Sequence, residues 1–321
     1  MNKIFRICFT VCKAIPLLVI LSIIGWSYYA YIIVMCIETV PASSTGEKVL
    51  LIVFYHLFLV IFLWSYAQAS LTWPIRPPRQ FELSPSEWAS LEEVGSSRQR
   101  KTEYLLGLVR QRGLPVYTRA NGNGIRICED CRLIKPDRAH HCSTCGCCLL
   151  KMDHHCPWVN NCVGFHNYKF FVQFLMYGSL YCFYVGCTTA KYFVKFWTAG
   201  IGNVHAVRFH LLFLFFVAWM FFIALVGLGG YHLYLTLLNL TTLESFRAPM
   251  FEFGPDKRAY HAGLKNNFKQ VFGNDRLMWL LPMFSSQGSG LVFPTRHEFG
   301  DDHDNLLAGP RGLDSDVEAN K

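Results

Sequence analysis

The chain has 321 residues, of which 52% are hydrophobic and 16% are charged. Because charged residues make up about a quarter of an average soluble domain, this composition argues against an ordinary soluble protein. The formal net charge is +8, which is compatible with nucleic acid, acidic lipid or an anionic ligand. The basic residues flank long apolar segments, so we expect a membrane surface and a phosphorylated ligand as partners, and no nucleic acid.

In chain order, four apolar segments reach the length of about 20 residues that a helix needs to cross a bilayer. They cover residues 14–37, 49–71, 170–190 and 209–238. The first is too long for a signal-peptide core. Buried core helices of a large soluble protein are the alternative reading. The sequence predicts an all-α polytopic membrane protein with four transmembrane helices.

The distribution of lysine and arginine predicts the orientation of these helices. Basic residues without any acid precede the first helix, and many more lie in the connection 74–169. Lys195 and Arg208, in the loop between the last two helices, run against this pattern. On balance we expect both termini and the long connection to face the cytosol, in a Golgi, plasma or endosomal membrane.

The rest of the chain divides around these helices. A short amphipathic helix is predicted at 101–112, and residues 302–307 resemble an acidic dileucine sorting signal. The expected regions are an N-terminal part with two helices (1–73), a cytosolic connection (74–169) with a cysteine-rich domain (about 125–169), two further helices (170–240), a C-terminal region (241–284) and a disordered tail (285–321).

Cysteine and histidine alternate with metal-ligand spacing in the connection. Disulfides stabilise small secreted chains, whereas this large membrane chain mixes Cys with His, which favours metal ligands. Pairs two residues apart place two thiolates on one tetrahedral ion. The candidate ligands, enough for two closed Cys3His zinc sites, are Cys128, Cys131, His141, Cys142, Cys145, Cys148, His155 and Cys162. This set leaves out Cys156, which ends the run Asp153-His154-His155-Cys156.

That run and its surroundings resemble the signature of the DHHC family of protein S-acyltransferases, the palmitoyltransferases. Residues 241–244 (Thr-Thr-Leu-Glu) are similar to the family's T-T-x-E motif, and 260–267 to its aromatic-Gly-Asn motif. A cytosolic two-zinc domain between the second and third of four transmembrane helices is the family's arrangement. The resemblance implies structural support by Thr241, Thr242, Glu244 and Asn267.

The resemblance also implies how the ligands pair. One zinc would take Cys128, Cys131, His141 and Cys148. The other would take Cys142, Cys145, His155 and Cys162. Both ions would be structural, because a closed four-ligand site leaves no position for substrate. The implied substrates are palmitoyl-CoA or a similar acyl-CoA and cytosolic cysteines of membrane-associated proteins, with no redox cofactor.

The catalytic residues expected in this setting are Cys156 as nucleophile, His154 as general base and Asp153 as the group that orients His154. The resemblance implies a two-step reaction through an acyl-enzyme on Cys156. The alternative is that these residues are all structural or bind metal. A membrane-anchored zinc scaffold would fit that alternative, but it leaves Cys156 beside His154 and Asp153 unexplained.

The substrate would need an apolar and a basic site. Phe171, Phe174 and Tyr181 share one face of the third membrane helix; with Trp158 and Ser27 they are expected to line an acyl cavity, ordinary helix packing being the alternative. Basic residues expected to bind the CoA phosphates are Arg126, Lys135, Arg138 and His140, unless they form a solvated face. A channel or transporter is disfavoured, because the four predicted spans hold no Asp, Glu, Lys or Arg.

Overall fold

The computed structural model describes residues 3–198 and 206–296. The chain divides into two compact units. The first unit consists of Met1–Pro74, His154–Tyr234 and Asp275–Phe284, and the second of Ile75–Asp153, Leu235–Asn274 and the chain from Ser285 onward. The dileucine-like residues 302–307 lie outside the described residues.

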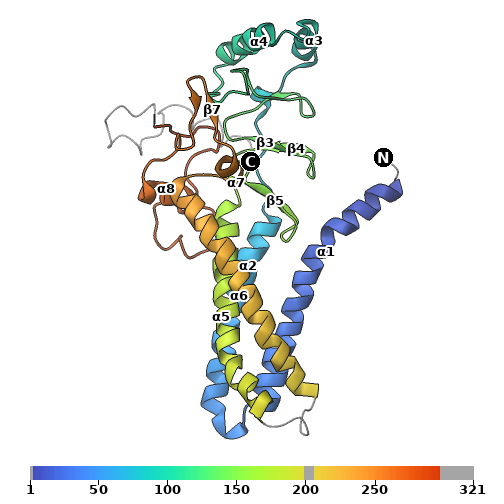
Figure 1. The fold of residues 1–321 in the computed structure, drawn as a ribbon, viewed down its shortest axis with the longest axis vertical. Coiled ribbons are helices and arrows are strands. Elements are labelled where there is room, and N and C mark those ends of the chain that lie inside the picture. The colour runs from blue at the N-terminus through green and yellow to red at the C-terminus, as the bar shows by residue number, and fades with distance from the viewer. Residues whose placement is uncertain (1–2, 199–205, 297–321) are drawn as a thin grey trace. The chain divides into compact units, whose positions relative to one another are not determined.

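Long helices dominate the first unit (Figure 1). They are α1 (Lys3–Tyr28), which continues as the π-helix η1 (Tyr29–Thr39), α2 (Thr45–Leu71), α5 (Tyr168–Thr198) and α6 (Ala206–Leu238), with the 3-10 turn η2 (Ala42–Ser44) before α2. The last residues of α6, from Leu235 on, belong to the second unit. Helix α2 packs along α5. Large apolar side chains stay exposed on them, such as Val60 and Ile223, as expected where helices face lipid.

Four helical stretches are long and apolar enough to cross a membrane, which confirms the predicted polytopic all-α architecture. They are Cys12–Thr39, Thr45–Leu71, Tyr168–Lys195 and Phe209–Leu238. The third begins before the predicted residue 170 and therefore includes Lys169, a buried cation. The chain is a multi-pass membrane protein.

A β-hairpin of β5 (His154–Cys156) and β6 (Asn161–Val163) also belongs to the first unit. Two asparagine side chains attach it to the end of α2. The Asn161 amide donates to the carbonyls of Ala69, Ser70 and Thr72, and the Asn167 amide donates to those of Ala69 and Cys162. These bonds satisfy carbonyls that the end of a helix leaves without intrahelical partners, and they fix the hairpin at the start of α5.

The second unit contains short helices and small antiparallel hairpins. Its elements are η3 (Arg79–Phe81), α3 (Pro85–Glu93), α4 (Arg98–Gln111), β1 (Ile127–Cys128), β2 (Leu133–Ile134), β3 (His140–Cys142), β4 (Cys147–Leu149), α7 (Thr242–Phe246), β7 (Met250–Phe251), β8 (Gly254–Pro255) and α8 (Leu264–Phe272). Strands pair as β1–β2, β3–β4 and β7–β8. A small apolar core of Phe81, Leu91, Leu105 and Ile134 supports α3 and α4.

Two features of this unit differ from the sequence expectations. Helix α3 was not predicted, although Ser84 and Glu87 form a capping box with Pro85 in the first turn, a recognisable helix start. In the stretch expected to be disordered, Phe293 and Thr295 are buried, and the Phe293 ring lies 5.9 Å from that of Tyr260. Amino-acid composition gives no signal of this contact, because it depends on a single aromatic side chain. Helix α4 overlaps the helix predicted at 101–112.

Candidate functional site

Four metal-ligand side chains meet inside the second unit. The His141 Nδ1 atom lies 3.4 Å from Cys128 Sγ, 3.3 Å from Cys131 Sγ and 3.9 Å from Cys148 Sγ. His141 stands directly opposite Cys148 in the β3–β4 pair, where cross-strand side chains are neighbours. A tetrahedral zinc with ordinary bond lengths separates sulfur from nitrogen by about 3.6 Å. The donor set therefore fits zinc.

Local backbone geometry explains how the two cysteines of this group converge. After Cys131 the chain turns through Arg132, whose φ of 48° is in the left-handed region. The same position after Cys145 is Gly146, with φ of 66°. Both C-x2-C turns therefore close in the same way, so that each presents its pair of thiols together.

The other four candidate ligands form two local pairs, Cys142 with Cys145 in the second unit and His155 with Cys162 in the first. The Cys145 backbone N–H donates to Cys142 Sγ at 3.4 Å. His155 stands opposite Cys162 in the β5–β6 hairpin, with 3.3 Å between Nδ1 and Sγ. Four of the eight candidate ligands thus form one Cys3His group, as the resemblance implied, and the other four form these two pairs.

Strand alternation separates the metal ligand from the candidate catalytic pair. Successive side chains of a strand point to opposite faces, so His155 faces Cys162 while His154 and Cys156 share the other face of β5. The Cys156 side chain is buried and belongs to neither Cys3His group. The His154 ring centroid lies 5.1 Å from that of Phe171 and 5.6 Å from that of His232.

Asp153 is the last residue of the first segment of the second unit, and it is fully buried. Its carboxylate accepts hydrogen bonds from the Thr242 backbone N–H at 2.8 Å and from the Thr242 hydroxyl at 2.7 Å. Thr241 and Glu244 form a capping box at the start of α7, which fixes Thr242 in place. The T-T-x-E motif therefore holds the aspartate of the D-H-H-C motif.

Arg138 is bound to Glu244 of the same motif and is only 2% exposed. Its Nε and Nη2 atoms donate to the two Glu244 carboxylate oxygens at 2.8 and 2.6 Å, and Nη1 donates to Asn239 Oδ1. Its guanidinium also stacks over Tyr260. Burial by itself raises the pKa of Glu244, but Arg138 more than offsets this and the pKa is lowered. Arg138 thus forms an internal ion pair in the second unit.

Asn267, the remaining support residue, is also fully buried. Its amide donates to the Leu237 carbonyl at 2.7 Å, and its Oδ1 accepts from the Ala262 backbone N–H at 2.9 Å. It therefore ties the start of α8 to the end of α6, where the helix leaves carbonyls that need partners.

A basic cavity of about 670 Å³ lies in the second unit. Its lining includes the predicted residues Arg126, Lys135, Arg138 and His140, together with Arg98, Arg119 and Arg247. Arg126 is held by hydrogen bonds to Thr118 Oγ1 and the Ala139 carbonyl. Burial, with the nearby Arg126 cation, lowers the pKa of His140 to about 3, so His140 offers hydrogen bonds rather than charge. The three further arginines were missed, because no sequence spacing brings 98, 119 and 247 together.

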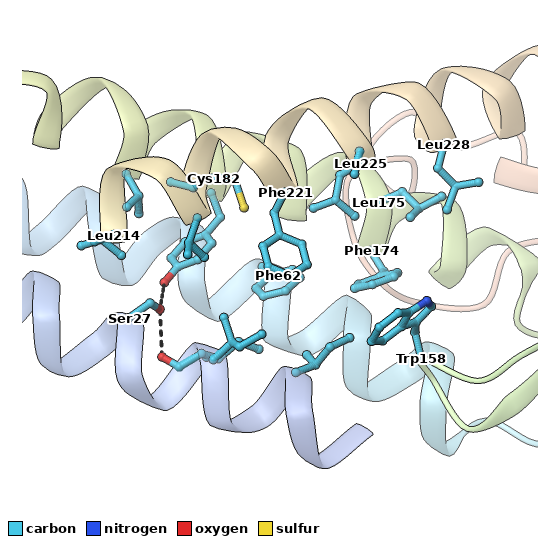
Figure 2. Close-up of a pocket in the computed structure, with 18 of the residues that line it drawn as sticks. Ser27, Phe62, Trp158, Phe174, Leu175, Cys182, Leu214, Phe221, Leu225 and Leu228 are labelled. Atoms are coloured by element: carbon cyan, nitrogen blue, oxygen red, sulfur yellow. Dashed lines mark hydrogen bonds between the residues drawn. The ribbon is translucent and has the colours of Figure 1, made fainter. Parts of the chain in front are cut away.

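An apolar cavity of about 250 Å³ lies among the helices of the first unit. Its wall includes Cys156 and all five residues predicted for an acyl site: Ser27, Trp158, Phe171, Phe174 and Tyr181. Figure 2 shows Trp158 near one end and Ser27 near the other, with Phe62 and Phe174 between them. From Phe171 to Tyr181 a helix rises about 15 Å. The cavity has the apolar lining that a site for an acyl chain requires.

Hydroxyl groups close the end of this cavity that lies far from Trp158. The Tyr181 hydroxyl is 2.8 Å from Ser27 Oγ and 2.8 Å from the Tyr55 hydroxyl, and Ser27 donates to the Ile24 carbonyl. Each hydroxyl proton has an acceptor when the hydrogen bonds run in one direction: Tyr55 donates to Tyr181, Tyr181 donates to Ser27, and Ser27 donates to the carbonyl. Tyr55 on α2 and His232 beside His154 are site residues that the sequence analysis missed, since neither stands in a motif.

Comparisons with known proteins agree with this geometry. Residues 121–248 match the family model described as DHHC palmitoyltransferase. Human palmitoyltransferase ZDHHC20 is 49% identical over 293 residues, which cover 91% of this chain and 79% of the relative. Human ZDHHC2 is 48% identical (90% and 77% covered), and ZDHHC15 of Xenopus laevis is 45% identical (91% and 84% covered). The chain therefore belongs to the DHHC family of palmitoyltransferases, which confirms the resemblance first seen in residues 153–156.

Proposed function

We propose that this palmitoyltransferase carries a long-chain acyl group on Cys156 and passes it from acyl-CoA to cysteines of membrane-associated proteins. One observation supports this most directly. Cys156 lines the apolar cavity while its strand neighbour His155 faces Cys162. The thiol of the run Asp153-His154-His155-Cys156 is thus not needed as a metal ligand and lies beside the apolar cavity proposed to hold an acyl chain.

In the proposed first step, the Cys156 thiol gives its proton to His154. The resulting thiolate attacks the thioester carbonyl, the bond from that carbon to the CoA sulfur breaks, and the proton on His154 passes to the CoA thiolate. In the second step an acceptor cysteine gives its proton to His154 and attacks the acyl-enzyme, and Cys156 recovers the proton. Asp153, held by Thr242, is the group proposed to orient His154.

We assign a structural zinc ion to each Cys3His group. When bound, zinc supplies rigidity to hairpins that have too little apolar core to be stable alone. Cys128, Cys131, His141 and Cys148 would hold one ion, and Cys142, Cys145, His155 and Cys162 the other. The reaction itself requires no redox cofactor, because a thioester is exchanged for a thioester.

The phosphates of CoA would bind in the basic cavity. Arg126 and Lys135 offer charge there and His140 a neutral hydrogen-bonding ring, while Arg138 is largely engaged with Glu244. Additional positive charge comes from Arg98, Arg119 and Arg247. A site that uses CoA would face the cytosol, consistent with the basic connection 74–169. The host membrane is proposed to be that of the Golgi, the cell surface or the endosomes.

The direct test is intact-mass measurement of the purified full chain after incubation with palmitoyl-CoA. We expect one added palmitoyl group per chain, which hydroxylamine removes because it is a thioester. Peptide mapping should place the group on Cys156. An adduct on another cysteine, or none in folded protein, would contradict the proposed intermediate.

Chain-length preference should depend on the closed end of the acyl cavity. Ser27→Phe is expected to shift preference to shorter acyl groups, since overfilling a packed site costs about 1–3 kcal/mol. Tyr181→Ala should admit longer ones. The measurement is competition among acyl-CoAs of different length, read as the mass of the acyl-enzyme. Val60→Phe, at an exposed position of α2, is the matched control and should leave the profile unchanged; an unchanged profile in both cavity variants would place the limit elsewhere.

A further inference from the structure

An apolar loop, residues 275–284, belongs to the first unit although it follows the short helices of the second in sequence. It forms no regular helix or strand. Four of its large apolar side chains are exposed: Leu277 by 72%, Leu280 by 66%, and Met283 and Phe284 by 45% each. So large an exposed apolar surface within ten residues indicates a contact surface.

The backbone of this loop is bound by three side chains of α5. Lys169 Nζ donates to the carbonyls of Met278 and Met283 at 2.5 and 2.7 Å. Gln173 donates to the carbonyls of Trp279 and Leu281, both at 3.0 Å, and the Tyr177 hydroxyl donates to that of Leu280. The three donors are spaced by four residues along α5, so they lie on one face of the helix.

The position of these donors identifies the surroundings of the loop. All three stand in the first turns of the stretch Tyr168–Lys195, which is apolar enough to cross the membrane. Loop carbonyls in water are satisfied by solvent, whereas irregular backbone at membrane depth is tolerated only where protein groups satisfy it. In this loop five carbonyls are bound by α5 side chains and the apolar side chains are turned outward. This is the arrangement expected of irregular backbone at membrane depth. Met176 and Leu180, on the same turns of α5, are exposed as well.

We propose that the apolar loop is inserted into the bilayer, in the leaflet that contains the first turns of α5, with Leu277, Leu280, Met283 and Phe284 against phospholipid acyl chains. Exposed Asp275 and Arg276 precede these side chains and mark the point where the chain enters from the headgroup region. The loop is thus a fifth membrane contact that does not span the bilayer. This membrane contact is independent of the catalytic roles proposed above.

Photo-crosslinking tests the proposed occupant. The photoreactive residue p-benzoyl-phenylalanine replaces Leu280 in the full chain, which is reconstituted in vesicles of phosphatidylcholine and phosphatidylserine with tritiated phosphatidylcholine. We expect a labelled lipid adduct at Leu280, as at the positive control Ile223, which is 69% exposed in the fourth membrane helix. Phe253, 61% exposed in the second unit, is the comparison position and should label far less. A crosslink from Leu280 to another protein chain, or no lipid adduct while Ile223 labels, would overturn the proposal.

A second measurement examines the anchor without altering the loop. Lys169→Met removes the donor to two carbonyls. Because such hydrogen bonds to a charged group are strong and costly to lose inside a membrane, amide exchange of peptide 275–284 in lipid nanodiscs should become about ten- to hundred-fold faster. Lys195→Met, at the other end of the same helix, should leave that exchange unchanged. Unchanged protection of the loop in Lys169→Met protein would contradict its anchoring by α5.

Discussion

Replacing Cys156 with serine is expected to abolish the acyl-enzyme while the protein folds and keeps its metal. The reason is that Cys156 lines the apolar cavity and belongs to neither Cys3His group. A hydroxyl beside His154 is a far weaker nucleophile at neutral pH than a thiol that can ionise. The measurement is the palmitoyl adduct by intact mass, together with metal content by elemental analysis.

A matched cysteine controls for the substitution itself. Cys147 is buried in β4, close in sequence to the ligand Cys148, and it also belongs to neither metal group. Cys147→Ser should keep both the acyl-enzyme and the metal. If Cys156→Ser protein still transferred palmitate at the normal rate, the proposed mechanism would be wrong.

Substitutions of the two adjacent histidines should have opposite effects. His154→Ala leaves the thiol and the ligands in place, so acylation should slow by about 10²–10⁴-fold, the usual contribution of a general base, without loss of metal. His155→Ala removes a ligand that lies 3.3 Å from Cys162 Sγ, so metal and thermal stability should fall. Under the alternative of a non-catalytic zinc scaffold, Cys156→Ser and His154→Ala would both be silent.

The sequence predicted those parts of the molecule that depend on local pattern. Membrane helices follow from long apolar runs, and the ligand groups follow from C-x2-C turns and adjacent histidines. The split between His154 and His155 also has a local cause, since alternate side chains of a strand face opposite sides. The short hairpin at residues 154–163 is sufficient to place the two histidines on opposite faces.

Residues that long-range packing brings together were not predictable in this way. Tyr55 meets Tyr181 because α2 packs along α5, and one aromatic among apolar residues gives no signal of that contact. Arg138 is predicted to bind CoA phosphates, but it forms an ion pair with Glu244, which is 106 positions away in the sequence. Lys169 lies outside the predicted third membrane helix because it is charged. Its hydrogen-bond acceptors, the carbonyls of Met278 and Met283, come from a distant segment that no local pattern reveals.

Elemental analysis of the folded chain is expected to return two zinc ions, and Cys131→Ser should lower this to one. The Cys131 sulfur lies 3.3 Å from His141 Nδ1 within the second unit, so its removal opens a site that has four ligands. Zinc binding to such a site is worth about 10–16 kcal/mol and is coupled to folding. Thermal stability should therefore fall together with metal content.

The second ion should depend on Cys145 in the same way, because the Cys145 backbone N–H donates to Cys142 Sγ and both residues are proposed as ligands of the second ion. Cys187→Ser, at an exposed position of α5, is the control and should retain both ions and the original melting temperature. Each ligand variant should lose one ion and keep the other if the two groups are separate. One zinc or none in folded wild-type protein would contradict the assignment of eight ligands to two sites, and loss of both ions from either variant would show that the sites form only together.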